Sequence, residues 1–163
     1  NSCTLSEFTA SLDFLFEAAP PLANYLYSQR PYRDWKHVIE VATTAVLSNK
    51  VFTREETASI LSAHPRLGAA VTTLSPSSAT EQRVTGAASD AEAREIARSL
   101  DRINAEYEAK FGFRLVEFVN GRSRKDLLPV LDARLRDGDA DTERVTGLTH
   151  MMLIAQDRLL KAE

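Results

Sequence analysis

The chain contains a single cysteine, Cys3, among its 163 residues, which excludes an internal disulfide. We expect an intracellular, cytoplasmic protein, since secreted domains of modest size are commonly rich in disulfides. No apolar run approaches the roughly 20 residues that cross a bilayer, and no secretory signal opens the chain, so we expect no membrane partner. The final Lys-Ala-Glu at 161–163 is not a peroxisomal signal of the Ser-Lys-Leu type. A peroxisomal location stays an alternative for a eukaryotic source, because the chain begins with Asn and a terminal signal could be missing.

A strong charge of either sign is also lacking. The 20 Lys and Arg residues oppose 23 Asp and Glu residues, which leaves a net charge of −3 at neutral pH. Nucleic-acid-binding surfaces are usually basic, so we expect no nucleic-acid partner. The short basic run at 122–125 is interpreted as the solvated start of a helix, with a phosphate-binding site as the alternative.

Patterns that bind metals or nucleotides are absent. The histidines at 37, 64 and 150 are far apart, and no cysteine pair accompanies them, so we expect no metal site. The six glycines are isolated rather than gathered in a phosphate loop, and no Gly-x-Ser-x-Gly turn indicates a serine hydrolase. His150, beside two methionines, is expected to pack in its helix.

Helical periodicity is what the chain does contain. With only 6 Gly and 6 Pro it has few residues for tight β-turns, and apolar residues recur three and four positions apart. Residues 115–119 alone look strand-like, and a single strand forms no sheet. We predict one all-α domain over residues 1–163, an irregular bundle of about seven or eight helices. Capping boxes, which mark helix starts, are expected at Thr4 with Glu7, Thr53 with Glu56, Ser78 with Glu81, and Ser89 with Glu92.

The most informative residue is His64, which precedes Pro65 at the expected end of a helix. Proline lacks a backbone donor and disfavours helical geometry in its predecessor, so the imidazole should stand at the helix end and face a pocket. Glu81 follows 17 positions later (81 − 64 = 17), with Gln82 directly after it. A titratable His near a Glu is a common arrangement for proton transfer. Two alternatives stay open: His64 binds only a carbonyl, and Glu81 only caps its own helix.

Several motifs in the same order resemble the 2-oxo-4-hydroxy-4-carboxy-5-ureidoimidazoline (OHCU) decarboxylase family, the last enzymes in the conversion of urate to (S)-allantoin. The resemblance extends over nearly the whole chain. The motifs are Glu17-x-x-Pro20, Arg30-Pro31-Tyr32, Ala-His-Pro-Arg-Leu-Gly at 63–68, Ser-x-x-Glu-Gln at 78–82, Asn104-x-x-Tyr107-x-x-Lys110-Phe-Gly-Phe, and Gly-Arg-Ser at 121–123.

The resemblance implies an all-helical homodimer that acts on a small ureidoimidazoline without a metal or an organic cofactor. By position, His64 would be the catalytic acid or base and Glu81 its catalytic companion. The residues implied to bind the substrate are Pro65, Ser78 and Gln82, the backbone of Leu115, Val116, Glu117 and Phe118, and Arg158 as the anchor in the last helix.

The chain departs from the family at two positions beside this expected site. Arg114 stands where proline is common, and Glu117 where apolar residues are common. A buried Glu117 is costly unless it is paired, so the pocket wall and the substrate preference stay open. Two other functions remain as alternatives: a non-catalytic helical binding or scaffold protein of the same fold, and an acid/base enzyme acting on a related ureide.

Overall fold

The computed structural model describes residues 2–69, 74–83 and 85–162. Within these ranges the protein has eight helices and no strand, which confirms the predicted all-α class and the expected number of helices. The helices are α1 (Leu5–Phe16), α2 (Pro20–Ser28), α3 (Trp35–Leu47), α4 (Arg54–Ser62), α5 (Pro76–Glu81), α6 (Asp90–Phe111), α7 (Arg124–Asp137) and α8 (Ala140–Ala162).

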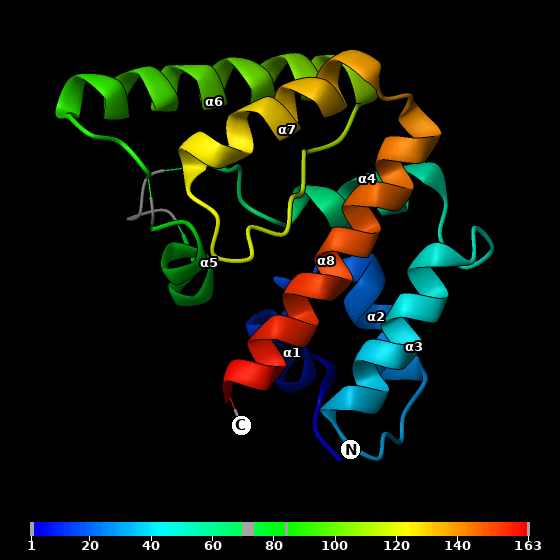
Figure 1. Ribbon diagram of the computed structural model, residues 1–163. Coiled ribbons are helices and arrows are strands. Elements are labelled where there is room, and N and C mark those ends of the chain that lie inside the picture. The colour runs from blue at the N-terminus through cyan, green and yellow to red at the C-terminus, as the bar shows by residue number, and fades with distance from the viewer. Residues whose placement is uncertain (1, 70–73, 84, 163) are drawn as a thin grey trace.

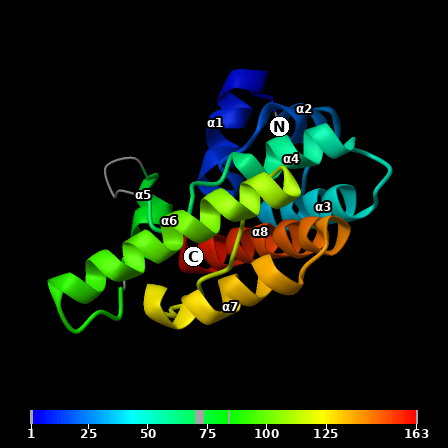
Figure 2. The same ribbon diagram turned by 90° about the horizontal axis from the view of Figure 1, so that it is seen from above.

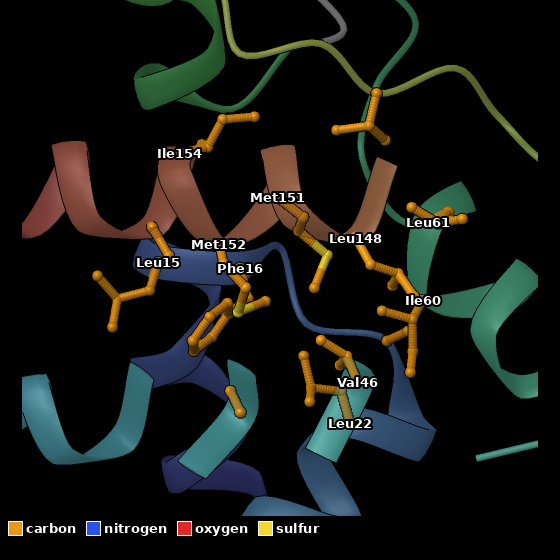
Figure 3. Close-up of a cluster of buried hydrophobic side chains, with 14 of the residues drawn as sticks. Leu15, Phe16, Leu22, Val46, Ile60, Leu61, Leu148, Met151, Met152 and Ile154 are labelled. Carbon is orange, nitrogen blue, oxygen red and sulfur yellow. The ribbon is translucent and has the colours of Figure 1, made fainter. Parts of the chain in front are cut away.

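Helix α8 is the centre of the bundle. It packs against α1, α3 and α4, while α6 and α7 lie side by side across one end (Figures 1 and 2). Leu148 and Met151 of α8 are fully buried, and side chains from the first four helices surround them (Figure 3). Burial of this apolar face, rather than intrinsic helix propensity, is the main source of helix stability in such a bundle.

The predicted capping boxes at Thr4 and Thr53 are confirmed, because in each the hydroxyl accepts a backbone N–H and the glutamate returns the bond. The box at Ser89 is half right. The Ser89 hydroxyl caps α6, but the Glu92 carboxylate accepts the N–H of Ala88 instead of that of Ser89. Gly112 ends α6 with φ of 79°, a left-handed conformation that glycine adopts without strain.

The expected capping box of Ser78 and Glu81 is wrong. Helix α5 begins at Pro76, and the hydroxyl of Ser75 caps it by accepting the Ser78 N–H at 3.2 Å. Proline is well suited to the first position of a helix, where its missing N–H costs nothing. Ser78 is therefore the third residue of α5, and its hydroxyl makes contacts other than a helix cap.

Residues 113–119 run between α6 and α7 without regular secondary structure, as the sequence analysis expected of a strand-like stretch without a partner. Arginine side chains take over the hydrogen bonds that a neighbouring strand would make. Arg134 binds the Val116 carbonyl at 2.8 Å, and Arg122 binds the carbonyls of Phe118 and Val119. Buried backbone groups require such partners, so these side chains fix the path of the segment.

We predict that Leu61→Ala lowers the free energy of unfolding by about 2–5 kcal/mol, because it leaves a cavity in the core. Leu61 is fully buried on α4, and a Cβ added at Gly147 of α8 would lie only 3.0 Å from its Cδ2. Urea unfolding measures the loss. Leu160→Ala is the control, since Leu160 is 67% exposed, and a change of more than about 0.5 kcal/mol there would contradict this account.

Candidate active site

A cavity of about 480 Å³ opens between α5, α8, the end of α4 and the segment 115–121. The structure brings all of the residues that the resemblance implied for the site to its wall. These are His64, Pro65, Ser78, Glu81, Gln82, Leu115, Val116, Glu117, Phe118 and Arg158. Residues from four distant parts of the sequence thus surround one space of the size that small ligands occupy.

His64 stands directly after α4 and is only 4% exposed. Its ring bonds to the backbone of Phe16, and its Nε2 atom is buried without a hydrogen-bond partner in the described part of the chain. Burial lowers the pKa of His64 to about 4, although the nearby Glu17 carboxylate opposes this shift. His64 is therefore neutral near pH 7, and its unpartnered nitrogen is an acceptor for a proton from a ligand.

Arg158 of α8 is buried among two carboxylates and a hydroxyl. Its Nε donates to Glu81 at 2.7 Å, and its Nη2 donates to Glu17 and to Ser78, each at 3.0 Å. Burial opposes the charge on Arg158, but its hydrogen bonds and the two carboxylates outweigh that cost and raise its pKa. Glu81 is thus held by Arg158, and this contact is what replaces the capping role predicted for it.

Glu17 is the site residue that sequence reasoning missed. The Ser75 and Ser78 hydroxyls both donate to its carboxylate, and it is the acid whose charge acts on His64. Burial raises the pKa of Glu17, but the bonds from Ser78 and Ser75 outweigh it and hold the pKa below its usual value. Glu17 also ends α1 with φ of 50°, in the left-handed region.

A signal for Glu17 was present in the sequence. An acidic side chain at the C-terminal end of a helix lies against the negative end of the helix dipole, which disfavours it. A non-glycine residue in the left-handed region costs further energy, and such strain is concentrated at functional sites. Glu17 directly follows Phe16, the last residue of α1, so its carboxylate destabilises the end of that helix. An acid at such a position indicates a role outside the helix.

Two polar contacts hold the loop that carries His64. The Gln82 side-chain oxygen accepts the Gly68 N–H at 2.8 Å and so ties this loop to the end of α5. Arg114 donates through Nη1 to the carbonyls of Ser62 and His64, at 2.9 and 3.0 Å. The arginine that replaces the family's common proline therefore binds the carbonyls at the end of α4, which have no partner within the helix.

The buried Glu117 is paired with two arginines, which offsets the free-energy cost of burying its charge. Its carboxylate lies 2.8 Å from Arg122 Nη2 and 2.7 Å from Arg134 Nη1. Burial raises its pKa, but the nearby His150 and the hydrogen bond from Arg122 outweigh this and lower the pKa to about 2. His150 does more than pack, because its Nδ1 accepts the Phe118 N–H at 3.0 Å. Arg122, the first residue of the basic run, binds Glu117 while its side chain stays 39% exposed.

No group of three or more His, Cys, Asp or Glu side chains is placed to hold a metal ion within the described residues. In the same part of the chain, the search for a helix with the length and apolar character needed to span a bilayer finds none.

We predict that the His64 imidazole titrates near pH 4, well below the 6.5 of an unstructured histidine. The unfolded chain then binds a proton between these values that the folded chain does not, so stability falls as the pH drops from 6.5 to 4, by up to about 1.4 kcal/mol per pH unit. NMR titration of the ring protons gives the midpoint, and His64→Gln should remove this share of the pH dependence. A midpoint at or above 6.5 would contradict the buried neutral state.

Comparison with known proteins places this site in context. The sequence profile of the OHCU decarboxylase family matches residues 1–160. The chain is 29% identical over 159 residues to the uric acid degradation bifunctional protein PucL of Bacillus subtilis (strain 168), and the match covers 98% of this chain but 31% of that protein. The chain therefore spans about a third of the length of that relative.

Two solved structures share the fold. A crystal structure of an OHCU decarboxylase in the presence of (S)-allantoin has a TM-score of 0.69 at 20% identity and covers 93% of this chain and 96% of its own. A crystal structure of an (S)-allantoin synthase has a TM-score of 0.64 at 18% identity, over 98% of this chain and 51% of its own.

Proposed function

Because the chain belongs to the OHCU decarboxylase family, we propose that it converts 2-oxo-4-hydroxy-4-carboxy-5-ureidoimidazoline to (S)-allantoin and CO2 in urate degradation, without a metal or an organic cofactor. The observation that carries this proposal is the buried, unpartnered Nε2 of His64 in a cavity that also contains Glu81 and Arg158. A buried neutral base suits a substrate that must lose a hydroxyl proton.

The chemistry needs three proton transfers and the cleavage of one carbon–carbon bond. The bond between the carboxylate and the ring carbon that also carries the hydroxyl breaks, CO2 leaves, and the electron pair passes through the neighbouring carbon to the ring nitrogen of the C=N bond, which takes a proton from solvent. The resulting enol then loses its hydroxyl proton to become a carbonyl, while the ring carbon bearing the ureido group gains a proton. His64 Nε2 is the acceptor for the hydroxyl proton in this proposal.

Charged groups in the cavity support a division of roles. His64 is neutral, so it does not serve as the cation for the substrate carboxylate. Arg158 remains charged, and its Nη1 makes only two long contacts, 3.4 Å to the carbonyls of Phe14 and Leu15. That nitrogen is the donor with capacity for a substrate oxygen, whereas Nε and Nη2 are held by Glu81 and Glu17. Glu81 in this scheme acts by fixing the guanidinium.

We predict that His64→Gln and Glu81→Gln each fold but lose about 10²–10⁴-fold in turnover, because the first removes the proton acceptor and the second removes the carboxylate that fixes the Arg158 guanidinium. The assay follows (S)-allantoin by circular dichroism after OHCU is generated in place. His37→Gln is the matched control, since His37 lies outside the cavity. Turnover close to that of the unaltered protein in both site variants would refute these roles. Absence of stereospecific product from the unaltered protein favours the alternative of a non-catalytic binding or scaffold protein. The same assay with a panel of ureides tests the alternative of an acid/base enzyme acting on a related ureide.

The homodimer expected from the family resemblance is also a proposal. Large apolar side chains that are 40–43% exposed in the described residues support it, because a subunit interface would bury such groups. They include Leu5, Phe14, Trp35 and Val145. We predict a dimer at micromolar concentration in sedimentation equilibrium, and a mass of one chain, 18.1 kDa, would contradict it. The cytoplasmic location stays a prediction.

A further inference from the structure

Glu117 is the centre of a charged cluster behind the cavity wall. Its side chain is 2% exposed and contacts two arginines. Arg122 lies in the loop just before α7, and Arg134 lies within α7. His150 of α8 brings Nδ1 to 3.3 Å from the same carboxylate. The residue lies in the wall of the cavity, and its carboxylate is buried in this cluster.

The same three partners hold the backbone on either side of Glu117. Arg134 Nη1, which binds the carboxylate, also donates to the Val116 carbonyl at 2.8 Å. Arg122 Nη2 likewise binds both the carboxylate and the Phe118 carbonyl. His150 accepts the Phe118 N–H at 3.0 Å. Each arginine therefore joins the Glu117 carboxylate to a neighbouring peptide group, while His150 holds the Phe118 N–H directly.

These contacts use one edge of the segment. Val116 and Phe118 alternate with Leu115 and Glu117, and in an extended chain the backbone groups of alternate residues point to opposite edges. The edge of Val116 and Phe118 is held by the cluster. The N–H groups of Leu115 and Glu117 have no hydrogen-bond partner among the described residues, and both residues line the cavity.

We propose that Glu117 is a positioning residue for substrate recognition: with Arg122, Arg134 and His150 it fixes residues 115–118 so that the opposite backbone edge binds a planar cyclic ureide. Such a ring carries alternating N–H and C=O groups, which a preorganised peptide edge pairs without losing conformational entropy on binding. This inference rests on the proposed function for the identity of the ligand, and on the contacts of Glu117 for the mechanism.

A purely structural role for Glu117 is the competing explanation, and Glu143 provides the matched control. Glu143 is buried to the same degree, 4% against 5% exposed, and also pairs with Arg134. It instead binds the Tyr107 hydroxyl at 2.7 Å and has no hydrogen bond to residues 115–119. Loss of charge at either glutamate leaves Arg134 with one carboxylate, but only Glu117 also pairs with Arg122, which holds the Phe118 and Val119 carbonyls.

The test compares Glu117→Gln with Glu143→Gln in two measurements. In the first, hydrogen exchange of the Phe118 amide should rise about tenfold in Glu117→Gln and change little in Glu143→Gln, because only the first loosens the segment. In the second, KM for OHCU should rise about tenfold in Glu117→Gln with kcat within about twofold, the signature of lost binding with intact chemistry. Equal effects in the two variants, or unchanged KM and exchange in Glu117→Gln, would overturn the proposal.

Two additions keep the test decisive. If Glu117→Gln does not fold, the variant Arg122→Lys replaces it in the test. Lysine keeps the charge but cannot bind the carboxylate and two carbonyls at once. We expect KM for OHCU to rise about threefold in Arg122→Lys, and an unchanged KM overturns the proposal. If the unaltered protein does not decarboxylate OHCU, calorimetric binding of (S)-allantoin replaces KM. Binding that weakens only in Glu117→Gln then supports the positioning role although the proposed function has failed, and no binding refutes both.

Discussion

The arrangement of the cavity depends on the burial of one guanidinium. Arg158 is 4% exposed, and a buried charge is tolerated only when it is paired and fully hydrogen-bonded. Its partners Glu81 and Glu17 come from α5 and from the end of α1, so the ion pairs connect three segments that are distant in sequence. Helix α5 has only six residues and would be marginal alone. The contacts of Glu81 and Ser78 with Arg158 are what hold it against α8.

The same pairing sets the state of His64. Glu17 is shared between Arg158 and two serine hydroxyls, which hold it in place as a carboxylate beside the imidazole. Its charge favours the protonated imidazole, but burial prevails and the pKa of His64 is lowered to about 4. The two carboxylates therefore differ in role: Glu81 holds the cation, while Glu17 also limits how far the pKa of His64 falls. A His–Glu81 pair, as the sequence suggested, would have produced a more basic imidazole.

Local signals predicted most of the fold, because helix caps and apolar periodicity act within a few residues. The starts of α1 and α4 follow from Thr4 and Thr53 in this way. The start of α5 was predicted wrongly because two local signals compete: Ser78 and Glu81 have the spacing of a capping box, whereas Ser75 precedes Pro76, which favours the first position of a helix. The Ser78 hydroxyl instead accepts a hydrogen bond from Arg158, which lies 80 positions further along the chain. For the site, motif positions identified the residues of the wall, but which carboxylate meets which cation is a tertiary property that the motifs do not contain.

Glu117 shows why departures from a family pattern need to be considered in groups. A buried glutamate alone would be costly, and two arginines held against peptide carbonyls would be short of counter-charge. Together they are stable, because Arg122 and Arg134 each bind the carboxylate and a neighbouring carbonyl. An apolar residue at 117 would leave Arg134 with Glu143 alone and Arg122 with no carboxylate among the described residues. The stability of the charged cluster is therefore a joint property of Glu117 and its two arginines, and no single one of these residues accounts for it.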